Sequence, residues 1–171
     1  PGVTSVHPGD HVVMVFVPSC GRCIPCAEGR PALCEPGAAA NGAGTLLSGA
    51  HRLSQGDRTI HHHLGVSAFA EYATVAEESL VKINPDFDLT KAALFGCAVL
   101  TGFGAVVNTG RVPPGAQAAV VGLGGVGLSA LLGVKASGAR TVVAVDLSDD
   151  KLELAHTCLL YTSDAADDDA C

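Results

Sequence analysis

The sequence predicts an α/β protein in which a small β-rich module precedes the first elements of a parallel sheet. Up to about residue 90, short apolar stretches alternate with turns, as in small β-rich domains. Beyond that point strand and helix patterns alternate, and the strands are continuously apolar, as in buried parallel sheets. The 171 residues allow one domain or two partial ones, and a hydrophobic content of 48% excludes disorder for most of the chain.

In the β-rich module the expected strands are short and the expected loops are long. Residues 11–17 form an apolar strand candidate that ends at Pro18, and residues 19–36 form a cysteine-rich loop. Gly, Ala and Ser dominate residues 37–59, which we expect to be a surface loop. Two more short strands are expected over residues 68–75 and 81–83.

The second half alternates between helix and strand signals. Asp88 or Thr90 can cap a helix that runs toward Phe95, and Ser148 can cap the last one, whose first turn is acidic. The elements expected between them are a helix over 98–108, a turn over 112–115, a strand over 118–121, a helix over 124–137 that Gly138 ends, and a strand over 141–145; the last helix runs to residue 155.

Composition excludes several classes of function. The net charge of −7, without a Lys/Arg cluster, argues against nucleic-acid binding. No apolar run reaches the roughly 20 residues of a membrane helix, so we expect no membrane span. No secretion signal opens the chain, so we expect a reducing, cytoplasmic compartment.

Four cysteines lie close together near the N-terminus, and they predict a metal site. Their spacing is Cys-x2-Cys-x2-Cys-x7-Cys, and four thiolates complete a tetrahedral zinc site with no open position, which makes such a site structural. A disulfide pair and an iron–sulfur cluster are the alternatives, but the last gap and the residue after it differ from the ferredoxin pattern. The proposed ligands are Cys20, Cys23, Cys26 and Cys34.

A glycine-rich turn follows the expected strand over 118–121 and opens the next helix. In this strand–turn–helix context, Gly-x-Gly-x-x-Gly predicts a turn that holds a pyrophosphate at the helix N-terminus. Asp146, at the end of the next strand, can accept both ribose hydroxyls and would repel a 2′-phosphate, which favours NAD over NADP; Lys151 could reach the same ribose. A purely structural turn is the alternative. The proposed coenzyme residues of the turn are Gly122, Leu123, Gly124, Gly125, Val126 and Gly127.

A closed zinc loop followed by a dinucleotide turn resembles the zinc-dependent medium-chain alcohol dehydrogenases, with the class III-like branch most similar. The matching stretches are CGRCIPCAEGRPALC, IHHHLGVSAFAEYATV, GCAVLTGFGAVV and GLGGVGLSALLGVKASGARTVVAVD. The resemblance implies a partial GroES-like catalytic domain over residues 1–97 and the start of a Rossmann domain, its first βαβα part, over residues 98–157.

The resemblance also implies individual roles. Cys97 matches a ligand of the family's catalytic zinc, and Thr101 matches a position beside the nicotinamide. Phe16, His63 and Leu64 match positions that line the substrate pocket, although His63 departs from the aromatic residue common there. The run of three histidines at 61–63 does not predict a metal site, because adjacent side chains of an extended segment point to opposite faces.

The function implied is hydride transfer between a small alcohol or aldehyde and NAD, with structural and catalytic zinc, in a homo-oligomer (dimer or tetramer). A zinc-stabilised module without catalysis is one alternative. A zinc-free quinone reductase-like member of the superfamily is another, and a polyol or amino-alcohol dehydrogenase remains possible within the zinc branch.

Both ends of the chain are expected to be incomplete or artificial. The chain opens with proline, and it contains no Gly-His-Glu motif, in which the family carries a further catalytic zinc ligand. We expect that ligand upstream, and therefore no turnover by the chain alone. Residues 158–171 resemble a translated sequencing adapter, and we expect them to lie outside the fold.

Overall fold

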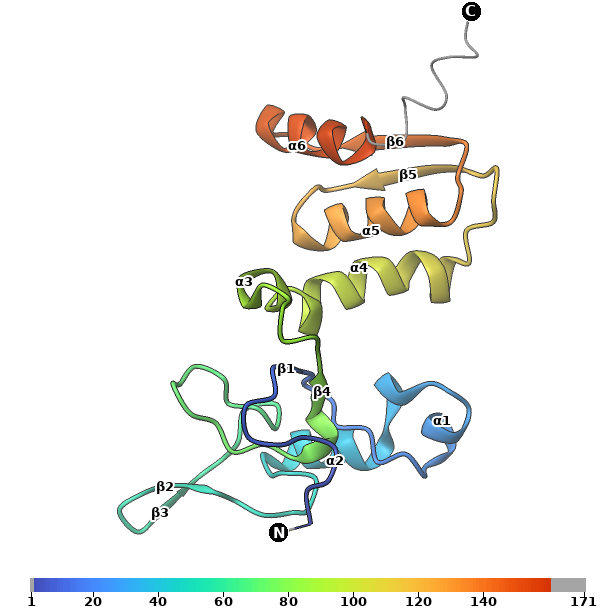
Figure 1. Ribbon diagram of the computed structural model, residues 1–171. Helices are drawn as coiled ribbons and strands as arrows, with labels where there is room; N and C mark the ends of the chain where they lie inside the picture. Colours follow the sequence, from blue (N-terminus) through green and yellow to red (C-terminus); the bar gives the residue numbers. More distant parts are fainter. Residues whose placement is uncertain (1, 161–171) are drawn as a thin grey trace, which may run out of the picture. The chain divides into compact units, whose positions relative to one another are not determined.

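The computed structural model describes residues 2–160, and the chain divides into two compact units, Pro1–Gly96 and Cys97–Cys171. Figure 1 follows the chain from the blue N-terminal strand to the red helix α6. The first unit contains short strands and the cysteine-rich loop, and the second contains a parallel strand pair with its helices. Each unit is described below on its own.

The strands of the first unit form two small antiparallel pairs. β1 (Val12–Met14) pairs with β4 (Leu80–Lys82), so the strand expected over 11–17 is present but only three residues long. β2 (Leu53–Gln55) and β3 (Arg58–Ile60) form a hairpin. Gly56 opens its two-residue turn with a φ of 58°, a conformation that glycine adopts without strain.

The sequence predicted a surface loop over residues 37–59. This prediction is wrong, because the segment contains the β2–β3 hairpin and most of a helix. Helix α2 (Glu35–Ala43) has a proline in its first turn and is capped by the thiol of Cys34, which accepts a hydrogen bond from the Gly37 amide. Gly44 ends the helix in the left-handed conformation, with φ 67°. The remaining helices of this unit are α1 (Ile24–Ala27), η1 (Pro31–Leu33), η2 (Glu77–Ser79) and α3 (Leu89–Ala92), the last capped by Asp88 as expected.

The strand expected over residues 68–75 is also wrong. The segment forms no strand, and the side chains of Phe69 and Tyr72 are 103% and 91% exposed. A strand needs a neighbour to satisfy its backbone groups, and none of the described residues pairs with this segment. The alternating pattern in the sequence was therefore not enough to predict a strand.

The second unit contains the predicted parallel pair. β5 (Gln117–Val121) and β6 (Thr141–Val145) lie parallel, with Ala119 opposite Val143. Helix α5 (Gly125–Ala136) connects them, and α6 (Asp149–Leu160) follows β6. A crossover helix between parallel strands is the βαβ unit that the sequence predicted.

The core of the second unit lies on one face of this strand pair. Leu123, Leu131 and Ala155 are each 1% exposed and form its centre. Each buried leucine contributes roughly 1.5–3 kcal/mol relative to an exposed one. Partly buried neighbours from both strands and both helices pack against this centre: Val120, Leu128, Val142, Ala144 and Leu152.

Before β5 the chain is helical, in the segments η3 (Phe95–Val99), α4 (Leu100–Gly104) and η4 (Ala105–Gly110). α4 packs so closely on α5 that a side chain at Gly102 would collide with the Val126 carbonyl and with Ser129. A side chain at Gly133 would press on Val106, 3.1 Å away. These glycines therefore set the distance between the two helices.

The helical stretch Leu89–Gly110 has 22 residues and a mean hydropathy of 1.6, so it is long and apolar enough to cross a membrane. The expectation that no stretch reaches this length is wrong by this criterion. Only 17% of this apolar stretch is buried, and the part of it that packs closely is α4, which lies against α5.

Candidate metal centre and dinucleotide site

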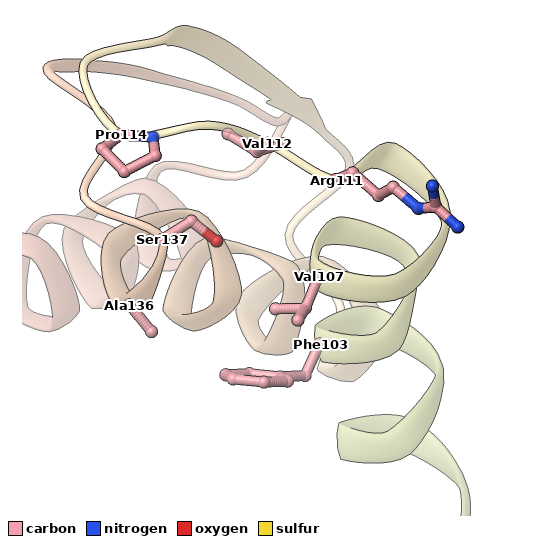
Figure 2. A pocket seen from close by; sticks show the side chains of 7 residues that line it. All are labelled: Phe103, Val107, Arg111, Val112, Pro114, Ala136 and Ser137. Atoms are coloured by element: carbon pink, nitrogen blue, oxygen red, sulfur yellow. The ribbon is translucent and has the colours of Figure 1, made fainter. Parts of the chain in front are cut away.

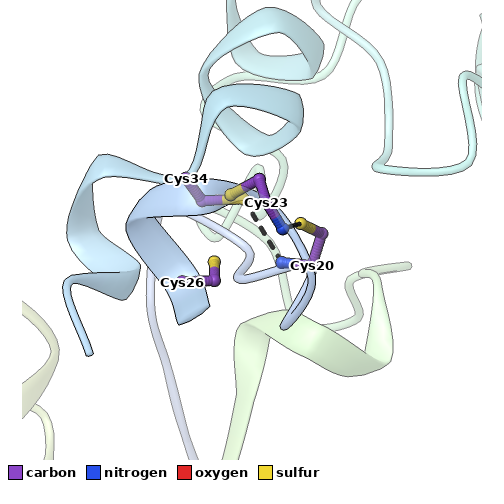
Figure 3. A group of neighbouring side chains, drawn as sticks. All are labelled: Cys20, Cys23, Cys26 and Cys34. Atoms are coloured by element: carbon purple, nitrogen blue, oxygen red, sulfur yellow. Dashed lines mark hydrogen bonds between the residues drawn. The ribbon is translucent and has the colours of Figure 1, made fainter. Parts of the chain in front are cut away.

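The four cysteines of the first unit converge on one point. Their Sγ atoms all lie within 4.8 Å of one another, and Figure 3 shows the side chains gathered between the turn before α1 and the start of α2. Among the described residues, this is the only cluster of three or more His, Cys, Asp or Glu ligands. Cys20, Cys23, Cys26, Cys34 and Cys97 are free thiols.

Backbone amides stabilise negative charge on the sulfur atoms. The amide of Cys20 donates to Cys34 Sγ at 3.2 Å, the amide of Cys23 donates to Cys20 Sγ at 3.4 Å, and the amide of Gly37 donates to Cys34 Sγ at 3.4 Å. Such bonds orient metal-bound thiolates and tune them. Cys34 is fully buried, so its sulfur is shielded from solvent.

The surroundings of the cluster shift the pKa values of two of its thiols in opposite directions. Hydrogen bonds from the backbone of Arg22 and Cys23 lower the pKa of Cys20 to about 6. Loss of solvation and the neighbouring thiols raise the pKa of Cys26 to about 12. Thiols this close cannot all lose their protons unless a cation compensates the charge. The donor set is therefore that of a closed tetrathiolate zinc site, which is structural.

The glycine-rich turn of the second unit joins β5 to α5. Gly122 has a φ of 87°, which favours glycine, and a side chain at Gly127 would collide with the Gly122 carbonyl. Gly124, the N-cap of α5, has open space where a Cβ would point. No side chain caps α5, so its first amides are free to bind an anion. The turn thus fits the pyrophosphate of a dinucleotide.

The carboxylate of Asp146 holds this turn in place. Its Oδ2 accepts a hydrogen bond from the Leu123 amide at 2.6 Å, and its Oδ1 accepts one from the Ser148 amide at 3.0 Å. Lys151 Nζ lies 3.5 Å from Oδ1. The hydrogen bond from the Leu123 amide, followed by the one from the Ser148 amide, holds the pKa of the Asp146 carboxyl below its usual range. The group is therefore anionic at neutral pH.

The anchoring of the turn by Asp146 is a role that sequence reasoning missed. The sequence predicted only a contact of Asp146 with the ribose hydroxyls. The bond to the Leu123 amide joins residues 23 positions apart, and no local pattern encodes it. The signal in the sequence that could have indicated this role was the position of the Asp146 carboxylate directly after β6.

Cys97 and Thr101 lie four positions apart on η3 and α4, and both are exposed. Side chains four positions apart on a helix share a face, so they are neighbours within the second unit. Cys97 is not part of any cluster of potential metal ligands among the described residues. One thiol cannot hold a catalytic zinc, so the described residues do not fit such a site, and no reaction step is derived through it.

The predicted substrate-pocket residues lie on two segments of the first unit. The side chains of Phe16 and Leu64 are 42% and 39% exposed, and His63 is also exposed. Leu64 has a φ of 52°, an unusual value for a leucine.

The neighbouring histidines have structural contacts. His62 is 3% exposed, and its Nε2 accepts a hydrogen bond from the Arg52 amide at 3.0 Å. Burial and the nearby His51 lower the pKa of His62, so it is neutral at neutral pH. His61 Nδ1 lies 3.2 Å from the carbonyl of Ala43, at the end of α2. His61 and His62 therefore take part in contacts within the first unit.

A cavity of about 480 Å³ lies in the second unit, where α4 and η4 meet the end of α5. Figure 2 shows Phe103 and Val107 on one side of it and Ala136 and Ser137 on the other, with the Arg111 guanidinium turned away. Its lining is mostly apolar and contains none of the predicted site residues. No set of polar groups converges there, so it is not a candidate active site.

The sequence and the structure are similar to those of known dehydrogenases. A family profile described as the alcohol dehydrogenase GroES-like domain matches residues 1–85. S-(hydroxymethyl)glutathione dehydrogenase of Synechocystis is 44% identical over 154 residues, which are 90% of this chain and 42% of that protein.

Two solved structures extend this similarity. An alcohol dehydrogenase zinc-binding domain protein of Burkholderia ambifaria matches with a TM-score of 0.82 and 34% identity, over 92% of this chain and 43% of that one. Benzyl alcohol dehydrogenase of Acinetobacter calcoaceticus matches with a TM-score of 0.79 and 36% identity, over 92% and 42%. The chain therefore spans about two fifths of the length of these proteins.

Proposed function

We propose that the chain is part of a zinc-dependent medium-chain alcohol dehydrogenase, an enzyme that transfers hydride between an alcohol, or the corresponding aldehyde, and NAD; the match of residues 1–85 to the alcohol dehydrogenase GroES-like domain and the similarity to known dehydrogenases support this. The observation that carries this proposal is the glycine turn with its anchored carboxylate. The four-thiol cluster argues against the zinc-free quinone reductase-like alternative.

The coenzyme contacts are proposed residue by residue. The free amides at the start of α5 bind the pyrophosphate, and the open space at Gly124 lets it approach the backbone. Asp146 keeps lone pairs for the ribose hydroxyls, and its negative charge disfavours a 2′-phosphate. NAD, when bound, supplies the hydride acceptor for alcohol oxidation. Thr101 is proposed to contact the nicotinamide.

The substrate is proposed only as a class. Phe16, His63 and Leu64 are proposed to line an alcohol or aldehyde pocket, and the imidazole of His63 makes it more polar than an aromatic residue would. Cys97 is proposed as one ligand of a catalytic zinc whose other ligands lie outside the described residues. By resemblance, the intact protein is proposed to be a homo-oligomer, and the free thiols suit a reducing cytoplasm.

Coenzyme binding tests this proposal directly. The zinc-loaded chain is titrated with NADH and with NADPH, and binding is followed by the fluorescence of the reduced nicotinamide. We expect a preference for NADH that Asp146→Ser reduces at least about tenfold, because the charge repulsion is removed. Asp150→Ser, which changes an exposed carboxylate in the first turn of α6, is the control and should keep the preference. Equal binding of both coenzymes by the unaltered chain would contradict the proposal.

We also propose that the chain alone does not turn over alcohols, because Cys97 is its only proposed ligand for catalytic zinc. Incubation with NAD and a panel of alcohols should yield no NADH. Measurable NADH formation, abolished by Cys97→Ser, would overturn this part of the proposal and leave the coenzyme site standing.

A further inference from the structure

Helix α2 connects the four-thiol loop to both predicted pocket segments of the first unit. Its N-cap is Cys34, whose buried thiol belongs to the four-thiol cluster and accepts a hydrogen bond from the first turn of the helix. A side chain at Gly37 would collide with the Pro18 carbonyl, so the first turn of α2 rests directly on the segment that follows Phe16. The start of the helix is therefore positioned by the metal loop and by this close contact.

The side chain of Asn41, two turns into α2, contacts the two pocket segments. Its Nδ2 donates a hydrogen bond to the Phe16 carbonyl at 2.6 Å. On its other side, a Cβ at Gly65 would lie 3.3 Å from Asn41 Oδ1, so that oxygen faces the turn that follows Leu64. Asn41 Oδ1 is buried and accepts no hydrogen bond from the described residues. The amide thus fills the space between the two segments.

The turn that Asn41 faces is held in an unusual conformation. Leu64 and Ser67 have φ values of 52° and 44°, in the left-handed region. The amides of Val66 and Ser67 both donate to the His63 carbonyl, at 3.2 and 3.0 Å, and the His63 amide donates to Ser67 Oγ. Such a conformation persists only where its surroundings hold it. Asn41 and Gly65 form part of those surroundings.

The end of α2 holds the same segment at a second point. The amide of His62 donates to the Gly44 carbonyl at 2.8 Å, directly after the helix. His61 Nδ1 lies 3.2 Å from the Ala43 carbonyl. A helix of nine residues therefore links the metal loop at one end to the segment that contains His63 and Leu64 at the other.

We propose that Asn41 is a positioning residue for the substrate pocket, through which the structural zinc fixes the separation between Phe16 and the turn at Leu64. Zinc orders Cys34, Cys34 caps α2, and α2 places the Asn41 amide between the two segments. The inference rests on the proposed function only for the identity of the pocket. The mechanical link from metal to pocket segments depends on contacts within the first unit alone.

Hydrogen exchange measured by mass spectrometry tests the link in the full chain. We expect zinc to slow exchange in the peptide covering residues 61–67 by at least about fivefold. A fivefold change corresponds to about 1 kcal/mol, which is the typical contribution of one hydrogen bond. Asn41→Ala should reduce that slowing to less than about twofold, while the zinc affinity stays the same. The β5 peptide of residues 117–121, in the second unit, where zinc should change exchange little, is the internal reference.

Two further variants make the result decisive. Gly42→Ala changes the neighbouring residue of the same helix, where a Cβ meets nothing within 4 Å, and should keep the full zinc effect. Asn41→Asp retains the shape but replaces the donor with a carboxylate oxygen, and should behave like Asn41→Ala. The thiolate absorption of the Co²⁺-substituted chain reports whether the metal loop is intact in each variant.

Each outcome decides the proposal. It is overturned if Asn41→Ala keeps the full zinc effect at residues 61–67, or if zinc leaves that peptide unchanged. It is also overturned if both Asn41 variants lose the Co²⁺ absorption, because Asn41 would then support the metal loop itself. A chain that shows the coupling but fails the coenzyme test would refute the proposed function and leave the link in place.

In the complete enzyme, the same variant separates positioning from general stability. Asn41→Ala should raise KM for the alcohol about fivefold, with the Kd for NADH unchanged, because only the alcohol pocket is displaced. Gly42→Ala should leave both constants unchanged. A parallel loss of alcohol and coenzyme affinity would indicate a merely structural role and would overturn the proposal.

Discussion

The carboxylate of Asp146 performs two tasks with two oxygens. It anchors the Leu123 amide of the glycine turn and the Ser148 amide before α6. Its side chain is only 9% exposed, so these bonds are shielded from water. Because the folded protein stabilises the charged form, the pKa of this group is lower in the folded chain than in the unfolded chain. The turn geometry therefore depends on the ionisation of one residue.

This dependence predicts how stability changes with pH. A carboxyl with a lowered folded pKa stabilises the fold fully above its unfolded value of about 3.9, and the stabilisation is lost as the pH falls toward the folded value. We expect Asp146→Asn to be less stable than the unaltered chain at pH 6. The difference should shrink as the pH falls below about 4. Urea unfolding followed by circular dichroism at several pH values measures it.

A control separates this effect from general acid unfolding. Asp57→Asn alters an exposed carboxylate in the β2–β3 turn and should shift the urea midpoint little at any pH. If Asp146→Asn and the unaltered chain differed by the same amount from pH 6 to pH 3, the carboxylate charge would not be what anchors the turn.

Among the elements, the β5–α5 connection shows how glycines of one motif differ in role. Gly127 packs against the Gly122 carbonyl, whereas Gly124 faces open space at the helix N-terminus. We expect Gly127→Ala to destabilise the second unit by about 1–3 kcal/mol, as overpacking does. Gly124→Ala should fold normally and lose coenzyme affinity, because its Cβ occupies the space of the pyrophosphate.

Thermal unfolding and NADH titration of the two variants distinguish these roles. Gly42→Ala, a helical glycine outside the motif with open space around it, serves as the substitution control. An equal loss of stability in the Gly124 and Gly127 variants would mean that the turn is only a packing device, and the coenzyme assignment would fail.

The elements that sequence predicted well are those whose signals are local. The β5–α5–β6 order follows from continuous apolar runs separated by a glycine turn, and the four-thiol cluster follows from cysteines spread over 15 residues. Helix α2 was missed because its cap is a thiol, which is not a preferred capping group, and because proline and glycine in its first turn suggest a loop. The strand over 68–75 was wrongly expected because alternation does not reveal whether a partner strand exists.

The candidate site, like the fold, could be predicted from the sequence only where its signals are local. Spacing alone brought the four thiols together, whereas the contact of Asn41 joins residues 25 positions apart and leaves no trace in the local pattern. The anchoring bond of Asp146 has the same character. Roles set by a single long-range backbone contact require coordinates, since neither residue type nor spacing specifies the partner.

At the scale of the whole molecule, the two units are stabilised differently. The strands of the first unit are three residues long, and its four thiols converge on one point. The second unit has five-residue strands and a leucine-centred core without metal ligands around it. Metal should therefore matter to one unit and not to the other.

We expect zinc removal to unfold the first unit selectively. Chelation should speed hydrogen exchange in residues 2–96 by at least about tenfold, because structural zinc supplies much of the folding free energy of small metal domains. Exchange in residues 117–157 should change little. Cys34→Ser should reproduce the effect without chelator, and Cys97→Ser should not. Uniform acceleration across both ranges would show that the units fold as one.

The far face of the β5–β6 pair has a consequence for the behaviour of the chain in solution. Val121, Val143 and Val145 are 79%, 50% and 44% exposed on the face opposite the core, and the described residues give the pair no third strand. Open strand edges beside an apolar face promote self-association. The net charge of −7 opposes this association by mutual repulsion, which salt screens. Concentrated preparations should therefore remain clear in dilute buffer and become turbid as the ionic strength rises.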